Sequence, residues 1–150
     1  KNMKIAIAKQ LTYWQDPQGD VLLFYSERDC NVYFGCWLQS GEPADFACKL
    51  TFYDTGAIRS YPREFLPYQI KNHEYHSKIL LVEDSDMLKE YKLYRTHQYP
   101  NDKRPLKQLL HFIVVGHDIY HEILPEKYEE QKVMIHEITD DRVRNLILNA

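Results

Sequence analysis

The sequence has few of the residues that mark phosphate-binding loops and disulfide scaffolds. Its five glycines are isolated, so none builds the glycine-rich loop that cradles a phosphate. The three cysteines, Cys30, Cys36 and Cys48, contain no C-x-x-C pair, and a sparse, odd set is typical of a reducing compartment. We therefore expect free thiols and a cytoplasmic setting, with Cys30, in a polar stretch, as the one candidate for a reactive thiol.

Long apolar runs and an excess of positive charge are also missing. No apolar run approaches the roughly 20 residues that a membrane helix requires, and residues 1–10 alternate instead of forming the apolar core of a signal peptide. A net charge of −3, with both signs interspersed, argues against general nucleic-acid binding, which needs a positive surface. We expect neither a membrane nor a nucleic-acid partner.

Tyrosine, in contrast, is abundant, with 12 residues against 6 Phe and 2 Trp. Tyrosine favours strands and half-wet surfaces, because its ring packs while its hydroxyl reaches a polar partner. This abundance predicts a β-rich domain, and an aromatic binding face is the alternative interpretation. The length of 150 residues, without an internal repeat or a Gly/Ser linker, predicts a single globular domain over residues 1–150.

Alternating apolar residues predict several strands in the first part of the chain. Residues 46–53 alternate most clearly, and turn residues separate about five such runs within residues 1–61, which favours an antiparallel meander. If residues 39–45 form a symmetric hairpin loop, Cys36 faces Cys48 across the pair. Two buried thiols or a redox-switchable disulfide would fit that arrangement.

The second half of the chain adds the helices. Ser85 predicts the N-cap of a short helix through Met87, Leu88, Tyr91 and at most Tyr94, followed by an exposed loop over residues 95–105. Thr139 predicts the cap of a helix over residues 140–149. Pro125 favours a helix start, although a strand over residues 132–138 is the rival interpretation. The predicted fold is α+β: a twisted, largely antiparallel sheet, curled as a possible half-barrel, with short helices mainly in the C-terminal half.

Residues 106–124 combine the longest apolar stretch with three histidines, His111, His117 and His121. The spacing H-D-x-x-H at 117–121 resembles a helical zinc motif, in which both imidazoles share one face. On a straight strand, at ~3.3 Å per residue, His117 and His121 would lie about 13 Å apart, too far for one metal ion. A hairpin turning at residues 116–118 is the favoured structure, with a continuous or bulged strand and a helical metal site as alternatives.

The candidate ligand-binding residues all come from this stretch. They are His111, His117, Asp118, His121 and Glu122. In the hairpin, His111 and His121 would approach each other across the strands beside Glu122, although solvated strand histidines explain the same pattern. His73, His76, His97 and His136 could join a site only if the fold gathers them. No serine lies in a nucleophile motif, and we expect no catalytic residue, cofactor or metal.

These observations favour a small, soluble, non-catalytic interaction module. It would present a tyrosine-rich sheet face or edge to a protein partner or to a second copy, and a homodimer is the expected form. Two alternatives remain: a curved-sheet binder of a small apolar ligand, and a metal-dependent hydrolase that uses the His117/His121 region.

Overall fold

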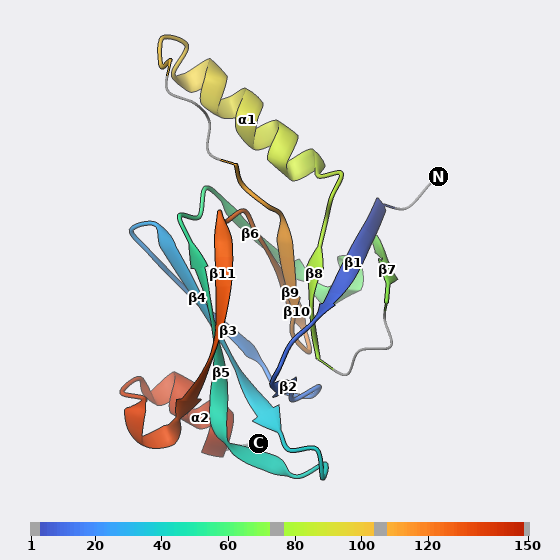
Figure 1. The fold of residues 1–150 in the computed structure, drawn as a ribbon, viewed down its shortest axis with the longest axis vertical. Helices are drawn as coiled ribbons and strands as arrows, with labels where there is room; N and C mark the ends of the chain where they lie inside the picture. Colours follow the sequence, from blue (N-terminus) through green and yellow to red (C-terminus); the bar gives the residue numbers. More distant parts are fainter. Residues whose placement is uncertain (1–3, 73–76, 104–107, 149–150) are drawn as a thin grey trace.

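A computed structural model describes residues 4–72, 77–103 and 108–148, which form two β-sheets and two α-helices (Figure 1). The six-stranded sheet contains, in spatial order, β6 (Ile58–Pro62), β10 (Ile119–Ile123), β9 (Phe112–Val115), β8 (Lys78–Leu81), β1 (Lys4–Gln10) and β7 (Tyr68–Lys71). The five-stranded sheet contains β11 (Lys127–Met134), β5 (Pro43–Tyr53), β4 (Asp29–Trp37) and β2 (Trp14–Gln15), and β3 (Val21–Ser26) also pairs with β4. The helices are α1 (Asp86–Gln98) and α2 (Asp141–Leu148), and two 3-10 turns are η1 (Arg63–Phe65) and η2 (Ile135–Glu137).

The predicted fold class is confirmed. The strand pairs are antiparallel except for β1 with β7, and both α-helices lie in the C-terminal half. The early strands do not form one meander, however. β1 and β6 belong to the six-stranded sheet, whereas β2 to β5 build the other one, because the chain changes sheets after β1 and again after β5. None of the described helices is long and apolar enough to cross a lipid bilayer.

The main core lies between the two sheets. Strand β5 contributes Phe46, Cys48, Leu50 and Phe52, the alternate positions that its sequence pattern predicts for one face. From the six-stranded sheet, Phe112, Val114 and Ile123 pack into the same cluster. Full burial of each such Leu or Phe stabilises the fold by about 1.5–3 kcal/mol, so this layer is the principal apolar contribution.

Helix α2 covers the outer face of the five-stranded sheet. Val143 and Ile147 pack there against Ala47 of β5 and Val133 of β11. The approach is close enough to require glycine at position 35, where a Cβ would lie 2.7 Å from the Leu146 carbonyl oxygen. The sheet therefore has an apolar layer on both faces.

The register of β4 and β5 differs from the predicted one. Phe34 pairs with Cys48, so Cys36 is not directly opposite Cys48. An irregularity between Gly35 and Trp37, together with a shorter turn before Pro43, shifts the pairing by two residues. All three cysteines are nevertheless free and buried, and Cys30 lies fully inside the core, not in a polar turn.

Two element boundaries were also predicted wrongly. Residues 127–134 form strand β11, neither the helix expected after Pro125 nor the rival strand at 132–138. The reason lies at Glu130, an inward position whose carboxylate accepts the backbone N–H groups of Thr12 and Tyr13, both at 2.9 Å. A polar residue at this inward position interrupts the apolar–polar alternation that would have predicted a strand. Its hydrogen bonds nevertheless attach the connection between β1 and β2 to β11. Helix α1 also runs on to Gln98, into residues predicted as loop.

Candidate functional site

The hairpin predicted within residues 106–124 is confirmed, but its register separates the two central histidines. Val115 pairs with Tyr120 and Val114 pairs with His121, and the Gly116 N–H donates to the Ile119 carbonyl at 2.8 Å, so the chain reverses at His117 and Asp118. A three-residue turn would have paired odd-numbered residues with each other. This tighter turn shifts the pairing by one residue, which turns His121 to the opposite face from His111 and Glu122.

Glu122 is the centre of a buried polar network on the concave face of the curled sheet. Its side chain is 1% exposed, and its carboxylate accepts hydrogen bonds from three side chains. Tyr68 Oη lies 2.8 Å and His111 Nε2 lies 2.9 Å from Oε1, while Arg59 Nε donates to Oε2. Three donors, one of them cationic, offset the cost of burying this charge.

The network continues from His111 to the start of α1. Ser85, the N-cap residue of that helix, lies 2.6 Å from His111 Nδ1 through its Oγ. The Leu88 N–H donates to the same Oγ at 2.9 Å, which leaves the hydroxyl proton for the imidazole. Because His111 Nε2 donates to Glu122, its Nδ1 accepts from Ser85, and the neutral tautomer satisfies every group.

The electrostatics follow from this geometry. Burial raises the pKa of Glu122, but hydrogen bonds from His111, Arg59 and Tyr68 outweigh it and lower the pKa to about 2. Burial also raises the pKa of Tyr68, and its hydrogen bond to the carboxylate raises it further. Tyr68 therefore stays protonated and Glu122 stays ionised at neutral pH, so the donor and acceptor roles in the network are fixed.

His121, on the other face of the hairpin, joins different partners. Its Nδ1 lies 2.6 Å from Ser60 Oγ on the neighbouring strand β6. Burial lowers the pKa of His121, and a hydrogen bond with the Val21 backbone opposes that shift only in part. His121 is thus a neutral bridge between β10 in one sheet and β3 in the other.

His117 and Asp118 lie at the tip of the hairpin, where both side chains are exposed. His117 Nδ1 lies 3.0 Å from Asp118 Oδ1, and the two residues border a shallow depression with Pro62, Arg63 and Glu64. The structure therefore distributes the five predicted site residues over three places: His111 with Glu122, His121 alone, and His117 with Asp118. The helical alternative for residues 117–121 was wrong, because they form a turn and a strand.

Ser85, His111 and Glu122 are connected in the order of a hydrolase triad, yet their setting is structural. Ser85 is 4% exposed and caps a helix, so a substrate carbonyl has no approach to its Oγ. Within residues 4–72, 77–103 and 108–148, no group of three His, Cys, Asp or Glu side chains could hold a metal ion. What the arrangement does is fix the base of α1 to the concave face of the sheet.

Three members of the network were not among the predicted site residues. Ser85 was recognised as a helix cap, but nothing in the sequence connects it to His111, 26 residues later. Arg59 and Tyr68 lie 63 and 54 residues from Glu122, and only sheet curvature brings them together. Of the other histidines, His97 and His136 are exposed. His73 and His76 lie outside the described residues.

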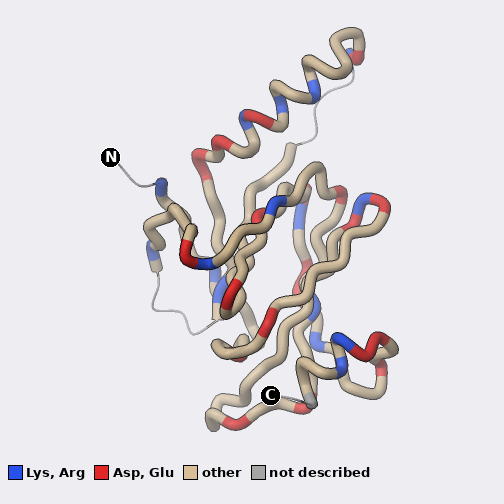
Figure 2. Tube along the Cα trace, turned by 180° about the vertical axis from the view of Figure 1, so that it is seen from behind, with Lys and Arg blue, Asp and Glu red and all other residues tan. Residues whose placement is uncertain are grey.

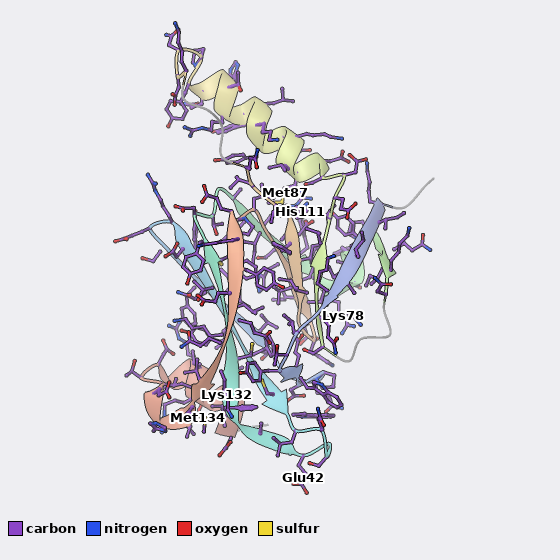
Figure 3. The ribbon with its side chains drawn as sticks, in the orientation of Figure 1. Glu42, Lys78, Met87, His111, Lys132 and Met134 are labelled. Carbon is purple, nitrogen blue, oxygen red and sulfur yellow. The ribbon has the colours of Figure 1, made fainter. Side chains whose placement is uncertain are left out.

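Helix α1 leads away from the body of the protein at the end of the sheets where this network lies, and Figure 3 places Met87 and His111 at its base (Figure 1). Met87 packs with Leu109 and Leu124, and Tyr91 joins them over Gly56, where a Cβ would lie 2.8 Å from the tyrosine ring. Beyond Tyr91 the helix leaves this contact. We call residues 92–103 the arm.

The arm exposes large apolar side chains although contacts within it involve Arg95, Asp102 and Tyr99. Leu93 is 72% exposed, Tyr94 is 71% exposed and Tyr99 is 54% exposed. Arg95 holds the end of the arm, because it pairs with Asp102 at 3.2 Å and lies 5.3 Å from the centre of the Tyr99 ring. Large exposed apolar side chains on a fixed helix are typical of contact surfaces.

Charge changes sign along this helix (Figure 2). The base of the helix carries three acidic residues, Asp84, Asp86 and Glu90, and one basic residue, Lys89. Lys4 of β1 lies 3.3 Å from Asp86, so these five residues together have a net charge of −1. The arm, residues 92–103, carries three basic residues (Lys92, Arg95 and Lys103) and one acidic residue (Asp102), a formal net charge of +2. The base is therefore negative and the arm positive.

Comparison of this chain with protein families, curated proteins and solved structures found no match.

Proposed function

We propose that the protein is a non-catalytic interaction module that works through its arm, and that the partner is a second copy of the chain. The observation that carries this proposal is the exposure of Leu93 and Tyr94 on a helix whose base is fixed by a buried network. An anchored helix loses little conformational entropy on docking, which favours association.

The position of the apolar pair supports a self-complementary contact. Leu93 and Tyr94 lie beside the midpoint of Asp86–Gln98. If two α1 helices pack antiparallel about a twofold axis near Leu93, these side chains meet their own copies. The same arrangement places the positive arm of one copy beside the negative base of the other. Electrostatic attraction and apolar contact therefore favour the same antiparallel geometry.

The distribution of tyrosine favours the arm over a sheet face. Tyr25 and Tyr61, which are also exposed, lie on strands of different sheets, whereas Tyr94 and Tyr99 both belong to the arm. A helix of 13 residues spans only about 20 Å, below the extent of a standard interface, so we expect a reversible dimer of micromolar affinity. Three free, buried thiols support a cytoplasmic setting for this module.

Light scattering after size exclusion, at protein concentrations from about 5 to about 500 µM, tests the association. We expect the mass to rise from monomer to dimer, and the dimer to weaken as salt increases, because the charged contacts are exposed. The double variant Leu93→Ser with Tyr94→Ser should remain monomeric. Its matched control, Tyr25→Ser with Leu38→Ser, removes apolar side chains of 50% and 44% exposure outside the arm and should still dimerise.

A cross-link tests the antiparallel geometry. With Leu93→Cys, a mild oxidant should trap a disulfide-linked dimer, since the axis places the two introduced thiols next to each other. Tyr25→Cys, at a position of β3 that is 50% exposed, should not be trapped. A wild-type protein that stays monomeric at every concentration would refute the proposal, as would equal behaviour of the arm and control variants.

A further inference from the structure

The curled sheet has a second end, opposite the arm, and a cavity opens there. The cavity holds about 220 Å³, and its floor consists of Leu66 after η1, Ile70 of β7, Leu80 of β8 and Val115 of β9. Leu80 and Val115 belong to the apolar cluster that fills the concave face. The cavity is thus the unfilled mouth of the half-barrel, a common position for ligand sites in curved sheets.

The rim of this cavity is cationic. Arg63 and Lys78 line it, and among the described residues no carboxylate does. Figure 3 places Lys78 at the far end of the sheet from His111. Arg63 thus brings a positive charge to the edge of an apolar cavity in a protein whose net charge is −3. Such a surface favours an anion with an apolar body.

The rim is also held in place. The Arg63 N–H donates to the Asp118 carbonyl at 2.8 Å, which fixes η1 to the β9–β10 turn. The Gln15 amide donates to the Val115 carbonyl at 2.8 Å, and Ser77 Oγ joins Gln15 N to the Tyr13 carbonyl. Because these contacts exist without a ligand, binding need not order the site.

We infer that this mouth binds a small organic monocarboxylate, with the apolar body on Leu66, Ile70, Leu80 and Val115 and the carboxylate at Arg63. The size is suitable, because benzene occupies a cavity of roughly 150 Å³, and the larger volume here leaves room for a carboxylate. Guanidinium can bind both carboxylate oxygens through two parallel hydrogen bonds. This site is separate from the arm and does not depend on dimerisation.

Titration of the full chain with benzoate, followed by backbone amide NMR, tests the site. We expect the amides of Leu66, Val115 and Gly116 to shift and saturate. Arg63→Gln should weaken benzoate at least tenfold, about 1.4 kcal/mol, because the charged contact is lost. Arg28→Gln, which removes an exposed arginine from the β3–β4 turn, should leave affinity unchanged.

Three controls separate the two parts of the ligand. Benzyl alcohol, with the ring but no charge, and inorganic phosphate, with the charge but no apolar body, should both bind much more weakly than benzoate. Val115→Phe fills the cavity floor and should abolish binding while Arg63 remains. Equal binding of benzyl alcohol or phosphate, an unchanged affinity in Arg63→Gln, or no benzoate-dependent shift up to roughly 20 mM would each overturn the inference.

Discussion

Among the residues that the structure describes, Glu122 is the most deeply buried one with an ionised side chain. An isolated buried carboxylate would neutralise itself by raising its pKa. Here Arg59, Tyr68 and His111 occupy both of its oxygens, and the ionised form is the stable one. The residue therefore joins β6, β7 and β10 to the segment before β9, and its charge state should govern the acid stability of the fold.

Acidification tests this role. The pKa of Glu122 is about 2 in the folded protein, below the value near 4.3 of an unfolded chain, so its stabilisation is complete above pH 4.5 and is lost as the pH falls toward 2. Glu122→Gln should lower the free energy of unfolding at pH 7 by about 1–3 kcal/mol, because it leaves the half-buried Arg59 without its anion and removes an acceptor of three hydrogen bonds. It should also flatten the acid dependence between pH 4.5 and 2. Urea unfolding at a series of pH values measures both effects.

Glu129→Gln is the matched control, since Glu129 is an exposed carboxylate on β11. It should change the stability at pH 7 by less than about 0.5 kcal/mol. An acid dependence in Glu122→Gln equal to that of the wild type would show that other groups control acid unfolding.

At the level of elements, the attachment of α1 depends on one hydroxyl. Ser85→Ala removes the N-cap and leaves His111 Nδ1 without its donor, so we expect a loss of about 1–3 kcal/mol. The loss should be local, with faster hydrogen exchange at Leu88 and Lys89 in the first turn. Ser85→Thr keeps the hydroxyl and should restore most of the protection.

Thr96→Ala provides the comparison for that experiment. Thr96 is an exposed residue of the same helix whose hydroxyl donates to the Lys92 carbonyl. Its replacement should leave exchange in the first turn unchanged. If Ser85→Ala likewise exchanged at the wild-type rate, the helix base would be held by Met87 and Tyr91 packing alone.

The sequence predicts the elements better than their pairing. Strand 46–53, the Ser85 cap and the hairpin around Gly116 are encoded locally, by period-two burial, a capping side chain and turn residues. The length of the hairpin turn is not encoded as clearly, and a turn one residue shorter than predicted directs His121 away from His111. Arg59, Tyr68 and Ser85 reach Glu122 and His111 through the curvature of the sheet, which a linear pattern does not contain.

At the scale of the whole molecule, the two sheets enclose one apolar core, and all three thiols lie in it. Cys30, Cys36 and Cys48 each have no more than 1% exposure, and burial raises the pKa of Cys30 and Cys36 to about 12. The pKa of Cys48 is raised further, by burial and by the neighbouring Cys36 and Glu130. A thiol in this layer becomes reactive only when the sheets separate.

Thiol labelling therefore measures opening of the entire fold. We expect no rapid reaction of the native protein with a thiol reagent at pH 8, and three reactive thiols in denaturant. The slow native reaction should proceed at one common rate for all three sites, and destabilisation by Glu122→Gln should accelerate it. Labelling of one cysteine well ahead of the others would indicate local opening instead.

The length of the turn between β9 and β10 has a consequence for how this sequence can vary. Exposed turns normally tolerate gain or loss of single codons. Here a deletion of one residue from 116–119 would exchange the two faces of β10, exposing Ile123 to the polar network and driving Glu122 into the core between the sheets. Homologues, when compared, should therefore vary in this turn by two residues or not at all.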